Sequence, residues 1–294
     1  MSVPVIGFVG FGEAGSRIAS GLRESGAGPL FAYDIAAQTA VLGERIYRRA
    51  AESRVELVDS NAELAARCPI VFSLVTAAAA MDAAHQNRPH LSPLHVYVDC
   101  NSVSPARKRD IADAIQSHGI PFVEAAIMQP VPKRQGHRVP MLVNGEAAHG
   151  LAQVLTPMGF ALETLSAPFG TAAAVKMCRS IVVKGLEALM TECVLAASEF
   201  GADDRVWASL QESHPGIHWK QLADYMVNRV AVHGERRAHE MEEVAETLRS
   251  VGIDPIMSEA AARRQRWAAE MQLASRFGSD GPGSYREVIE ALKL

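Results

Sequence analysis

The sequence predicts an α/β protein in which a doubly wound parallel sheet is followed by an all-helical domain. Two observations lead to this prediction. Through the first 166 of the 294 residues, short apolar runs rich in β-branched residues alternate with helical stretches, as in parallel sheets with crossover helices. From residue 167 onward the strand-like runs stop and helical patterns follow one another. We therefore expect two domains, residues 1–166 and 167–294, in line with the chain length.

The composition excludes several classes of protein. Hydrophobic residues make up 48% and charged residues 21% of the chain, which is typical of folded globular proteins. Lys and Arg total 29 against 33 Asp and Glu, so the formal charge of -4 favours neither nucleic acid nor an anionic membrane as a partner. The four cysteines are scattered, no apolar run reaches membrane-spanning length, and the start lacks the basic segment of a secretory signal. We expect a reduced, cytoplasmic protein with no structural metal site.

The elements of the first domain are predicted from apolar runs and helix caps. Strands are expected at residues 3–9, 29–34, 69–75, 94–99, 120–127, 140–144 and 160–164. The stretch 46–57 fits no single pattern, although residues 55–58 are compatible with a short strand. Ser60, with Glu63 three residues later, begins a helix to about Arg67. Ser104-Pro105 begins another helix to about residue 118, and Gly145 one more.

The second domain is predicted to begin with one long helix over residues 170–200, which Gly201 ends as a C-terminal cap. Further helices are expected at residues 203–213, 219–232, 235–251, 255–273 and 285–294. A His-Pro-Gly sequence, Gly234 and Gly252 separate them, and a glycine-rich loop over 277–283 precedes the last one.

A glycine-rich motif lies between the first strand and the helical stretch that follows it, and comprises Gly10, Phe11, Gly12, Glu13, Ala14 and Gly15. The first glycine permits a tight turn, the second lets the backbone approach a pyrophosphate, and the third allows close packing of helix and strand. The free N–H groups and the dipole at the helix start favour phosphate charges. This order of strand, turn and helix predicts a dinucleotide-binding site.

The second predicted strand ends in Asp34, 22 residues beyond Gly12. A carboxylate at this place accepts hydrogen bonds from the ribose hydroxyls and repels a 2′-phosphate. Residues 35–37 are neutral, so the sequence favours NAD over NADP.

Ligands of open α/β sheets bind beyond the carboxyl ends of the strands. Asp34, Thr76 and Asn101-Ser102 each follow a predicted strand, as the glycine motif does. We expect them to line one crevice together with the cofactor. The helical domain begins beside this crevice, so we expect the catalytic group to come from that side.

Lys176 is the predicted catalytic group. It lies in the first turns of the long helix among small and apolar neighbours, and Ser180 follows four residues on, on the same face. Partial burial and a nearby positive nicotinamide ring lower the pKa of a lysine, which allows proton exchange near neutral pH. The alternative is a lysine that merely extends from an apolar helix to water.

Residues 7–15, 99–105 and the Gly170-x5-Lys176 spacing resemble the β-hydroxyacid dehydrogenases, a family that includes 3-hydroxyisobutyrate and 6-phosphogluconate dehydrogenases. The resemblance implies a Rossmann domain, a helical second domain, dimerisation through helical packing, and a lysine as general acid/base. Lys176 occupies the position of that lysine.

The sequence departs from the family on the substrate side. Most members have Asp-Ala-Pro-Val-Ser-Gly-Gly, whose last three residues hold the substrate carboxylate, where this chain has Glu124-Ala-Ala-Ile-Met128-Gln129-Pro130. Arg179-Ser180 replaces Asn-Asn, and His239-Glu240 replaces a Lys-Asp pair. We therefore expect an altered substrate or a different anchor, with candidate substrate-binding residues Met128, Gln129, Ser180, Arg236 and His239. The basic segment 132–138 either meets a substrate anion or forms a solvated hairpin.

Together these features predict an NAD-dependent oxidoreductase that interconverts a hydroxy-acid-like alcohol and a carbonyl by hydride transfer. Its partners would be a small-molecule substrate and a second copy of the chain. Two alternatives remain open at this point. One is an imine reductase, which retention of Lys176 disfavours, and the other is an NAD-sensing regulatory module with a degenerate site.

Overall fold

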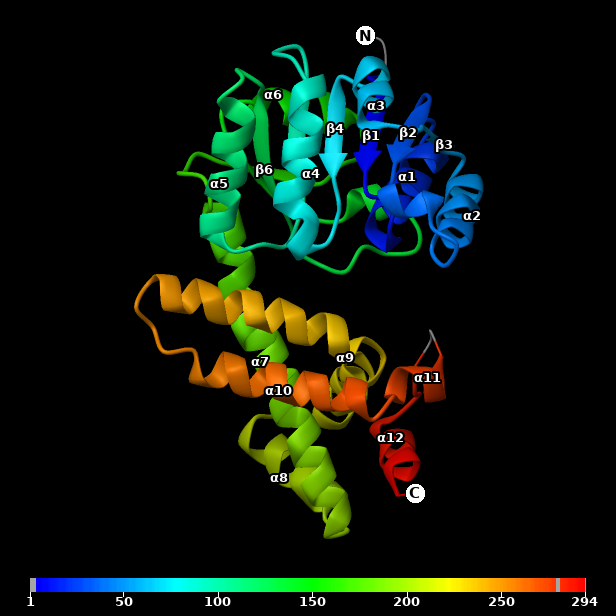
Figure 1. Ribbon diagram of the computed structural model, residues 1–294. Coiled ribbons are helices and arrows are strands. Elements are labelled where there is room, and N and C mark those ends of the chain that lie inside the picture. The colour runs from blue at the N-terminus through cyan, green and yellow to red at the C-terminus, as the bar shows by residue number, and fades with distance from the viewer. Residues whose placement is uncertain (1–3, 279–280, 294) are drawn as a thin grey trace. The chain divides into compact units, whose positions relative to one another are not determined.

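The computed structural model describes residues 4–278 and 281–293 (Figure 1). The chain divides into two compact units, Met1–Lys176 and Met177–Leu294. The first unit thus includes residues 167–176, which the sequence-based boundary assigned to the helical domain. Val3 in the first predicted strand, Ser279 and Asp280 in the predicted loop, and Leu294 at the end of the last predicted helix lie outside the described residues.

The first unit contains an eight-stranded sheet with the order β3-β2-β1-β4-β5-β6-β7-β8. Its strands are β1 (Ile6–Val9), β2 (Leu30–Tyr33), β3 (Glu56–Leu57), β4 (Ile70–Ser73), β5 (Val96–Asp99), β6 (Phe122–Ile127), β7 (Met141–Asn144) and β8 (Leu162–Leu165). The strand order reverses at β1, which pairs with β2 on one side and β4 on the other. Ligands of doubly wound sheets bind at such a switch point. The predicted α/β fold is therefore confirmed.

One strand departs from the predicted parallel arrangement. β7 runs antiparallel to β6, whereas every other neighbouring pair is parallel. The segment 128–140 between these strands contains only a 3₁₀ turn, Gly136–Arg138. A strand parallel to β6 would have to begin at the same edge of the sheet as β6, and reaching that edge requires a crossover connection. Since segment 128–140 contains no crossover helix, β7 begins at the edge where β6 ends and runs antiparallel to it.

Helices cover both faces of this sheet. They are α1 (Glu13–Glu24), α2 (Gly43–Ser53), α3 (Asn61–Arg67), α4 (Ala80–Asn87), α5 (Pro105–Gln116) and α6 (Ala148–Leu155). One buried cluster joins α1, α2 and α6 to side chains such as Phe8 and Phe72, and a second joins α3, α4 and α5 to Val9 and Tyr97. Because inner strands such as β1 and β4 are buried on both faces, their sequences are continuous apolar runs rather than alternating ones.

The second unit is helical. It contains most of α7 (Thr171–Glu199), then α8 (Asp203–Ser213), α9 (Trp219–Ser250), α10 (Ile256–Glu270), α11 (Leu273–Phe277) and α12 (Tyr285–Leu292). The predicted break near Gly234 is present: α9 consists of two helical parts that meet in a kink at His233, whose φ is -124° and ψ 17°. A Cβ at position 234 would lie 2.5 Å from the carbonyl oxygen of Gln265, so Gly234 also lets α10 approach closely beside the kink.

The predicted helix 255–273 is also divided in the structure. α10 ends at Glu270, and Gln272 adopts a left-handed conformation with φ 54° before α11 begins. A left-handed residue cannot continue a right-handed helix, so the chain turns here.

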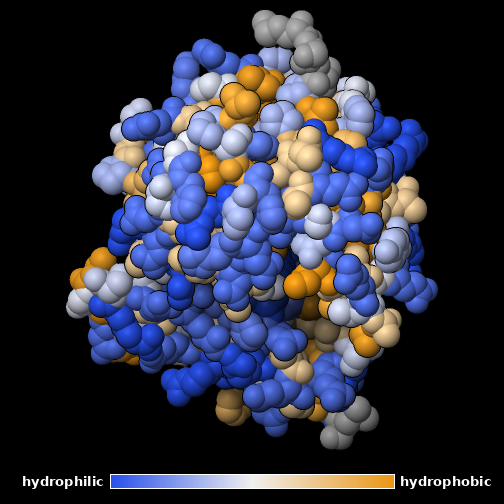
Figure 2. All heavy atoms as spheres, turned by 45° about the horizontal axis from the view of Figure 1, so that its top comes forward, coloured by the Kyte–Doolittle hydropathy of each residue, from blue (hydrophilic) through white to orange (hydrophobic). Residues whose placement is uncertain are grey.

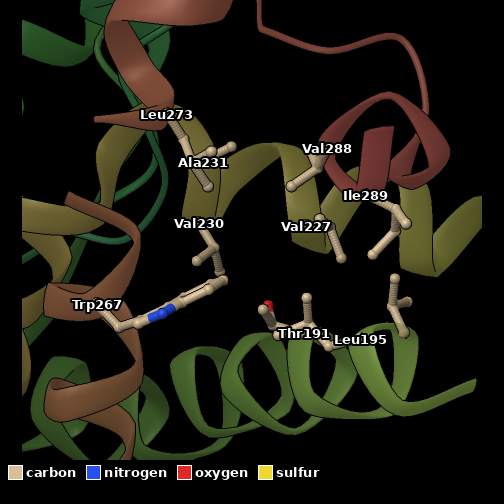
Figure 3. A pocket seen from close by; sticks show the side chains of 10 residues that line it. Thr191, Leu195, Val227, Val230, Ala231, Trp267, Leu273, Val288 and Ile289 are labelled. Carbon is tan, nitrogen blue, oxygen red and sulfur yellow. The ribbon is translucent and has the colours of Figure 1, made fainter. Parts of the chain in front are cut away.

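A small cavity of about 10 Å³ lies inside the second unit (Figure 3). Apolar side chains from α7, α9, α10, α11 and α12 surround it, among them Leu195, Val230 and Trp267. This space is at the lower limit for a single water molecule. It is therefore a packing gap and not a substrate site.

The face drawn in Figure 2 is mostly hydrophilic, and its hydrophobic residues are scattered. Single exposed apolar side chains are ordinary on folded proteins. Within residues 4–278 and 281–293, no helix has both the length and the apolar character needed to cross a membrane.

Candidate dinucleotide-binding and catalytic site

The glycine motif forms the turn between β1 and α1. Gly10 has a φ of 83°, and a Cβ there would lie 2.7 Å from the carbonyl oxygen of Leu74. A Cβ at Gly15 would lie 3.0 Å from the carbonyl oxygen of Gly10. Gly12, the N-cap of α1, differs from both because a Cβ there would meet nothing within 4 Å. Open space therefore lies beside Gly12 at the helix start, where backbone N–H groups and the helix dipole favour phosphate charges.

Asp34 follows β2 and joins it to the glycine turn. Its Oδ2 accepts a hydrogen bond from the backbone N–H of Phe11 at 2.7 Å, and its Oδ1 accepts one from Ala36 at 2.9 Å. The carboxylate therefore orders the loop after β1, and each oxygen keeps lone-pair capacity for a ribose hydroxyl. Glu13 is exposed, whereas Phe11 is fully buried and Ala14 half-buried.

Asn101 joins the loops that follow β4 and β5. Its Oδ1 accepts a hydrogen bond from the N–H of Val75 at 2.7 Å, and its Nδ2 donates to Ser73 Oγ at 2.9 Å and to the carboxylate of Asp99. The side chain is buried, and its bonding groups are directed at the protein. Thr76 is exposed directly after β4.

A buried ion pair lies at the end of β5, directly before the loop that carries Asn101. The Nζ of Lys108 in α5 lies 2.6 Å from Oδ2 of Asp99 and donates to the Asp99 carbonyl oxygen at 2.7 Å. Both side chains are at most 1% exposed. Two opposite charges out of water are tolerated only where their geometry is good and their remaining groups are bonded.

Lys176 reaches the same edge of the sheet. Its Nζ donates a hydrogen bond to Ser102 Oγ at 2.5 Å, and Ser102 follows the carboxyl end of β5. Lys176 is half-buried in the first turns of α7. The structure thus brings together Lys176 and the loop that carries Asn101.

The start of α7 is held by Glu124 of β6. Its Oε2 accepts a hydrogen bond from the N–H of Gly170 and its Oε1 one from Ala173, both at 2.8 Å. Met128 and Gln129 come after the same strand. Met128 packs against Ala126, Leu142 and Ala172 of a buried cluster, whereas Gln129 is exposed.

The basic segment 132–138 is anchored on α1. His137 is fully buried and shares a hydrogen bond with Ser25, between Nε2 and Oγ at 3.1 Å. Burial, helped by the positive charge of Arg138, lowers the pKa of His137. Arg17 donates a hydrogen bond to the carbonyl oxygen of Val131. Lys133 and Arg134 are exposed, so the segment is a docked loop with basic side chains at its surface.

The second unit holds the other predicted substrate residues in two settings. Ser180 is buried and accepts a hydrogen bond from Lys184 Nζ at 3.0 Å. Arg236 is largely exposed and forms an ion pair with Glu240 at 2.7 Å, and His239 is exposed on the same helix. Glu240 also contacts Lys184 at 3.0 Å, which places it between two cations.

A buried polar cluster continues from this ion pair into the helical unit. Glu187 of α7 lies 2.8 Å from Arg237 of α9 and accepts a hydrogen bond from Gln265 of α10 at 3.3 Å. Burial raises the pKa of Glu187 and lowers those of Lys184 and Arg237. Burial also opposes ionisation of Glu240, but the ammonium of Lys184 and the guanidinium of Arg236 outweigh it and lower the pKa of Glu240 to about 2.

Comparison with known proteins identifies the family. Residues 5–160 match the family described as the NAD binding domain of 6-phosphogluconate dehydrogenase. The chain belongs to the β-hydroxyacid dehydrogenase family. Residues 197–268 match a further domain, of unknown function, named DUF1932.

Three relatives show how far the family likeness extends. A conserved hypothetical protein from Sinorhizobium meliloti 1021 is 37% identical, with a TM-score of 0.75 and coverage of 99% of this chain and 96% of that one. A protein of unknown function with structural similarity to 3-hydroxyacid dehydrogenases is 30% identical, with a TM-score of 0.70 and coverage of 92% and 98%. The mitochondrial 3-hydroxyisobutyrate dehydrogenase of Drosophila melanogaster is 24% identical, over 73% of this chain and 64% of its own.

A more distant structure shares the fold alone. The imine reductase from Myxococcus stipitatus, in complex with NADP⁺, is 16% identical, with a TM-score of 0.56 and coverage of 91% of this chain and 94% of that one. A V8 variant of the same imine reductase is in complex with NAD⁺.

Several buried charged residues were missed by sequence reasoning. Lys108, Lys184 and Glu187 are charged residues inside helical patterns, where a solvated position is the ordinary interpretation. Their burial has no local signal in a single sequence. The described residues contain no cluster of three or more His, Cys, Asp or Glu side chains arranged to hold a metal ion.

Lys108→Met tests the buried ion pair. We expect the free energy of unfolding, measured by urea denaturation, to fall by about 3 kcal/mol, because Asp99 then keeps a buried charge without its partner. Adding Asp99→Asn should restore part of this loss. Arg134→Met, at an exposed position of the same unit, should change it by less than about 0.5 kcal/mol. An equal loss in both single variants would contradict the assigned role.

Glu240→Gln tests the ion pairs of α9. A carboxyl with a pKa of about 2, against an ordinary value of 4.5, stabilises the folded state when ionised. That stabilisation is complete above pH 4.5 and is lost as the pH falls toward 2. Between pH 5 and pH 3 the melting temperature of the wild type should therefore fall more steeply than that of Glu240→Gln. Glu246→Gln, exposed on the same helix, should follow the wild type, and parallel curves for all three would refute the interpretation.

Proposed function

We propose that the protein is an NAD-dependent oxidoreductase that interconverts an alcohol, in a small hydroxy-acid-like substrate, and a carbonyl. The observation that carries this proposal is the hydrogen bond from Lys176 Nζ to Ser102. It places an amine beyond the carboxyl end of β5, in the same sheet whose strand β1 leads into the glycine turn. An amine at such an edge is suited to proton transfer with a substrate hydroxyl.

Each residue at this edge has a separable part in the proposed reaction. The backbone N–H groups at the start of α1 bind the pyrophosphate, and the open space beside Gly12 admits it. Asp34 accepts hydrogen bonds from the ribose hydroxyls. When bound, the nicotinamide cofactor supplies the hydride acceptor or donor.

Lys176 moves the proton. In the oxidation, its neutral Nζ takes the proton of the substrate hydroxyl, and in the reduction the ammonium returns it. Ser102 accepts a hydrogen bond from the same Nζ and so limits the directions that the amine can adopt. Such orientation is part of the rate gain, since a reacting group held in place needs no further ordering.

The substrate-side residues lie in different surroundings. Met128 is engaged in packing and Gln129 is exposed after β6. The roles predicted for Ser180, Arg236 and His239 stay predictions, as does dimer formation. A row of exposed apolar residues on α7 is consistent with a helical interface between two copies, namely Val182, Leu186 and Leu189.

Asp34→Asn tests the cofactor preference. Removing the negative charge should lower repulsion of a 2′-phosphate and weaken ribose binding, so the ratio of the NADP Kd to the NAD Kd should fall roughly tenfold. Fluorescence titration with each cofactor measures both constants. Asp59→Asn, an exposed site of the same unit, serves as the control. An unchanged ratio in Asp34→Asn would exclude Asp34 as the selecting residue.

Lys176→Ala tests the mechanism. Turnover should fall by roughly 10²–10⁴-fold with little change in NAD affinity, because the variant lacks the acid/base but keeps the nucleotide-binding turn. A panel of alcohols, hydroxy acids and cyclic imines, followed by NADH or NADPH absorbance, provides the measurement, and Lys220→Ala is the control. Near-normal turnover in Lys176→Ala would contradict the proposed acid/base role of Lys176. Stoichiometric NAD binding without turnover of any compound would favour the sensing module instead.

A further inference from the structure

Glu124 is a fully buried carboxylate in the middle of β6. Besides the N–H groups of Gly170 and Ala173, it accepts a hydrogen bond from Asn144 Nδ2 at 3.2 Å. All three donors are N–H groups, and two of them belong to the start of a long helix, where backbone donors lack intrahelical partners and the dipole favours negative charge. The buried charge is thus stabilised by the beginning of α7.

The same contacts connect the sheet to Lys176. Ala173 lies three residues before Lys176, one turn of the helix away. Within the sheet, Glu124 of β6 is the register partner of Asp99 of β5, and Ser102 follows Asp99 by three residues. The hydrogen bond between Lys176 and Ser102 therefore starts from two segments that are both connected to the Asp99–Glu124 pair. Ser102 follows Asp99 in the chain, and Lys176 lies one helical turn after Ala173, whose N–H bonds to Glu124.

The start of α7 is also restricted by its close approach to α5. Gly170 has a φ of 95°, and a Cβ there would lie 2.8 Å from the carbonyl oxygen of Pro105, the first residue of α5. The helix start therefore fits closely against α5 on one side and is held by the Glu124 carboxylate. A side chain one methylene shorter, or one with a single acceptor oxygen, cannot satisfy both backbone donors from the same strand position.

We propose that Glu124 is a positioning residue that holds the start of α7 on the sheet so that Lys176 Nζ meets Ser102. This inference rests on the proposed function, in which Lys176 is the acid/base. Glu124 touches neither amine nor hydroxyl and acts through the helix start. A displacement of about 1 Å at a reacting group is enough to lower a rate about 10²-fold.

The direct test measures the Lys176 amine rather than turnover. Wild type, Glu124→Gln, Glu124→Asp and Ser102→Ala are treated briefly with sulfosuccinimidyl acetate, and peptide mass spectrometry gives the acetylation rate of each lysine. We expect at least a threefold faster reaction at Lys176 in Glu124→Gln and Ser102→Ala, because the amine is released from Ser102, and a smaller rise in Glu124→Asp. The exposed Lys220 and the buried Lys108 are internal references and should be unchanged, as should Lys176 in the control Glu163→Gln.

A double variant separates positioning from general loosening. If Glu124 acts through the bond between Lys176 and Ser102, adding Glu124→Gln to Ser102→Ala should give no further acceleration at Lys176, whereas independent effects would multiply. Multiplying effects, an equal rise at Lys108, or an unchanged Lys176 rate in the folded Glu124 variants would each overturn the inference. Glu124→Asp decides the matter if Glu124→Gln does not fold.

Kinetics then distinguish the two proposals. With the alcohol of the panel that turns over fastest, Glu124→Gln should lower kcat at least tenfold while the Kd for NAD stays within twofold. If the acetylation pattern is as expected but Lys176→Ala keeps wild-type turnover, the positioning role stands and the proposed reaction fails. If Lys176→Ala is inactive but acetylation of Lys176 does not respond to Glu124, the reaction stands and the positioning role fails.

Discussion

The carboxyl edge of the sheet keeps its shape because buried or half-buried polar side chains bond to the backbone N–H groups and side chains of neighbouring loops. Asp34 holds the glycine turn, Asn101 joins the loops after β4 and β5, and Glu124 holds the start of α7. Each of these groups would be costly to bury without a partner. Since each partner belongs to a different strand, loop or helix, satisfying the hydrogen bonds also sets the relative positions of the loops. The candidate site depends on this arrangement more than on any single catalytic side chain.

The second unit uses buried charge differently. Glu187 of α7 bonds to Arg237 of α9 and to Gln265 of α10, and Lys184 connects Ser180 with Glu240. Replacing such a cluster with apolar residues is often neutral for stability or better. The altered family positions, Ser180 and Glu240, both belong to this network. These two departures from the family pattern are therefore parts of one connected set of contacts.

Much of the first unit was predictable because its signals are local. Ser60 accepts a hydrogen bond from the N–H of Glu63, and Ser104 accepts one from Arg107, as their helix-cap patterns predict. Gly10 has a positive φ, as the glycine motif predicts. Helices α2 and α4 were missed, since α2 overlaps a stretch without a clear period and α4 lies in an alanine-rich segment. The direction of β7 was also wrong, because it depends on how the chain returns to the sheet and not on the residues of the strand.

By itself the sequence determined the kind of fold, the nucleotide-binding turn, the acidic residue after β2 and the lysine that identifies the family pattern. All of these depend on residue type and short spacing, where backbone conformation and local hydrogen bonds dominate. Only the tertiary structure decided that Lys176 meets Ser102, that Lys108 is buried against Asp99, and that Glu124 holds the start of a helix 46 residues away. These contacts join segments that are distant in the sequence and that the register of the sheet brings together. In addition, the residue type alone does not show whether a charged side chain is buried or exposed.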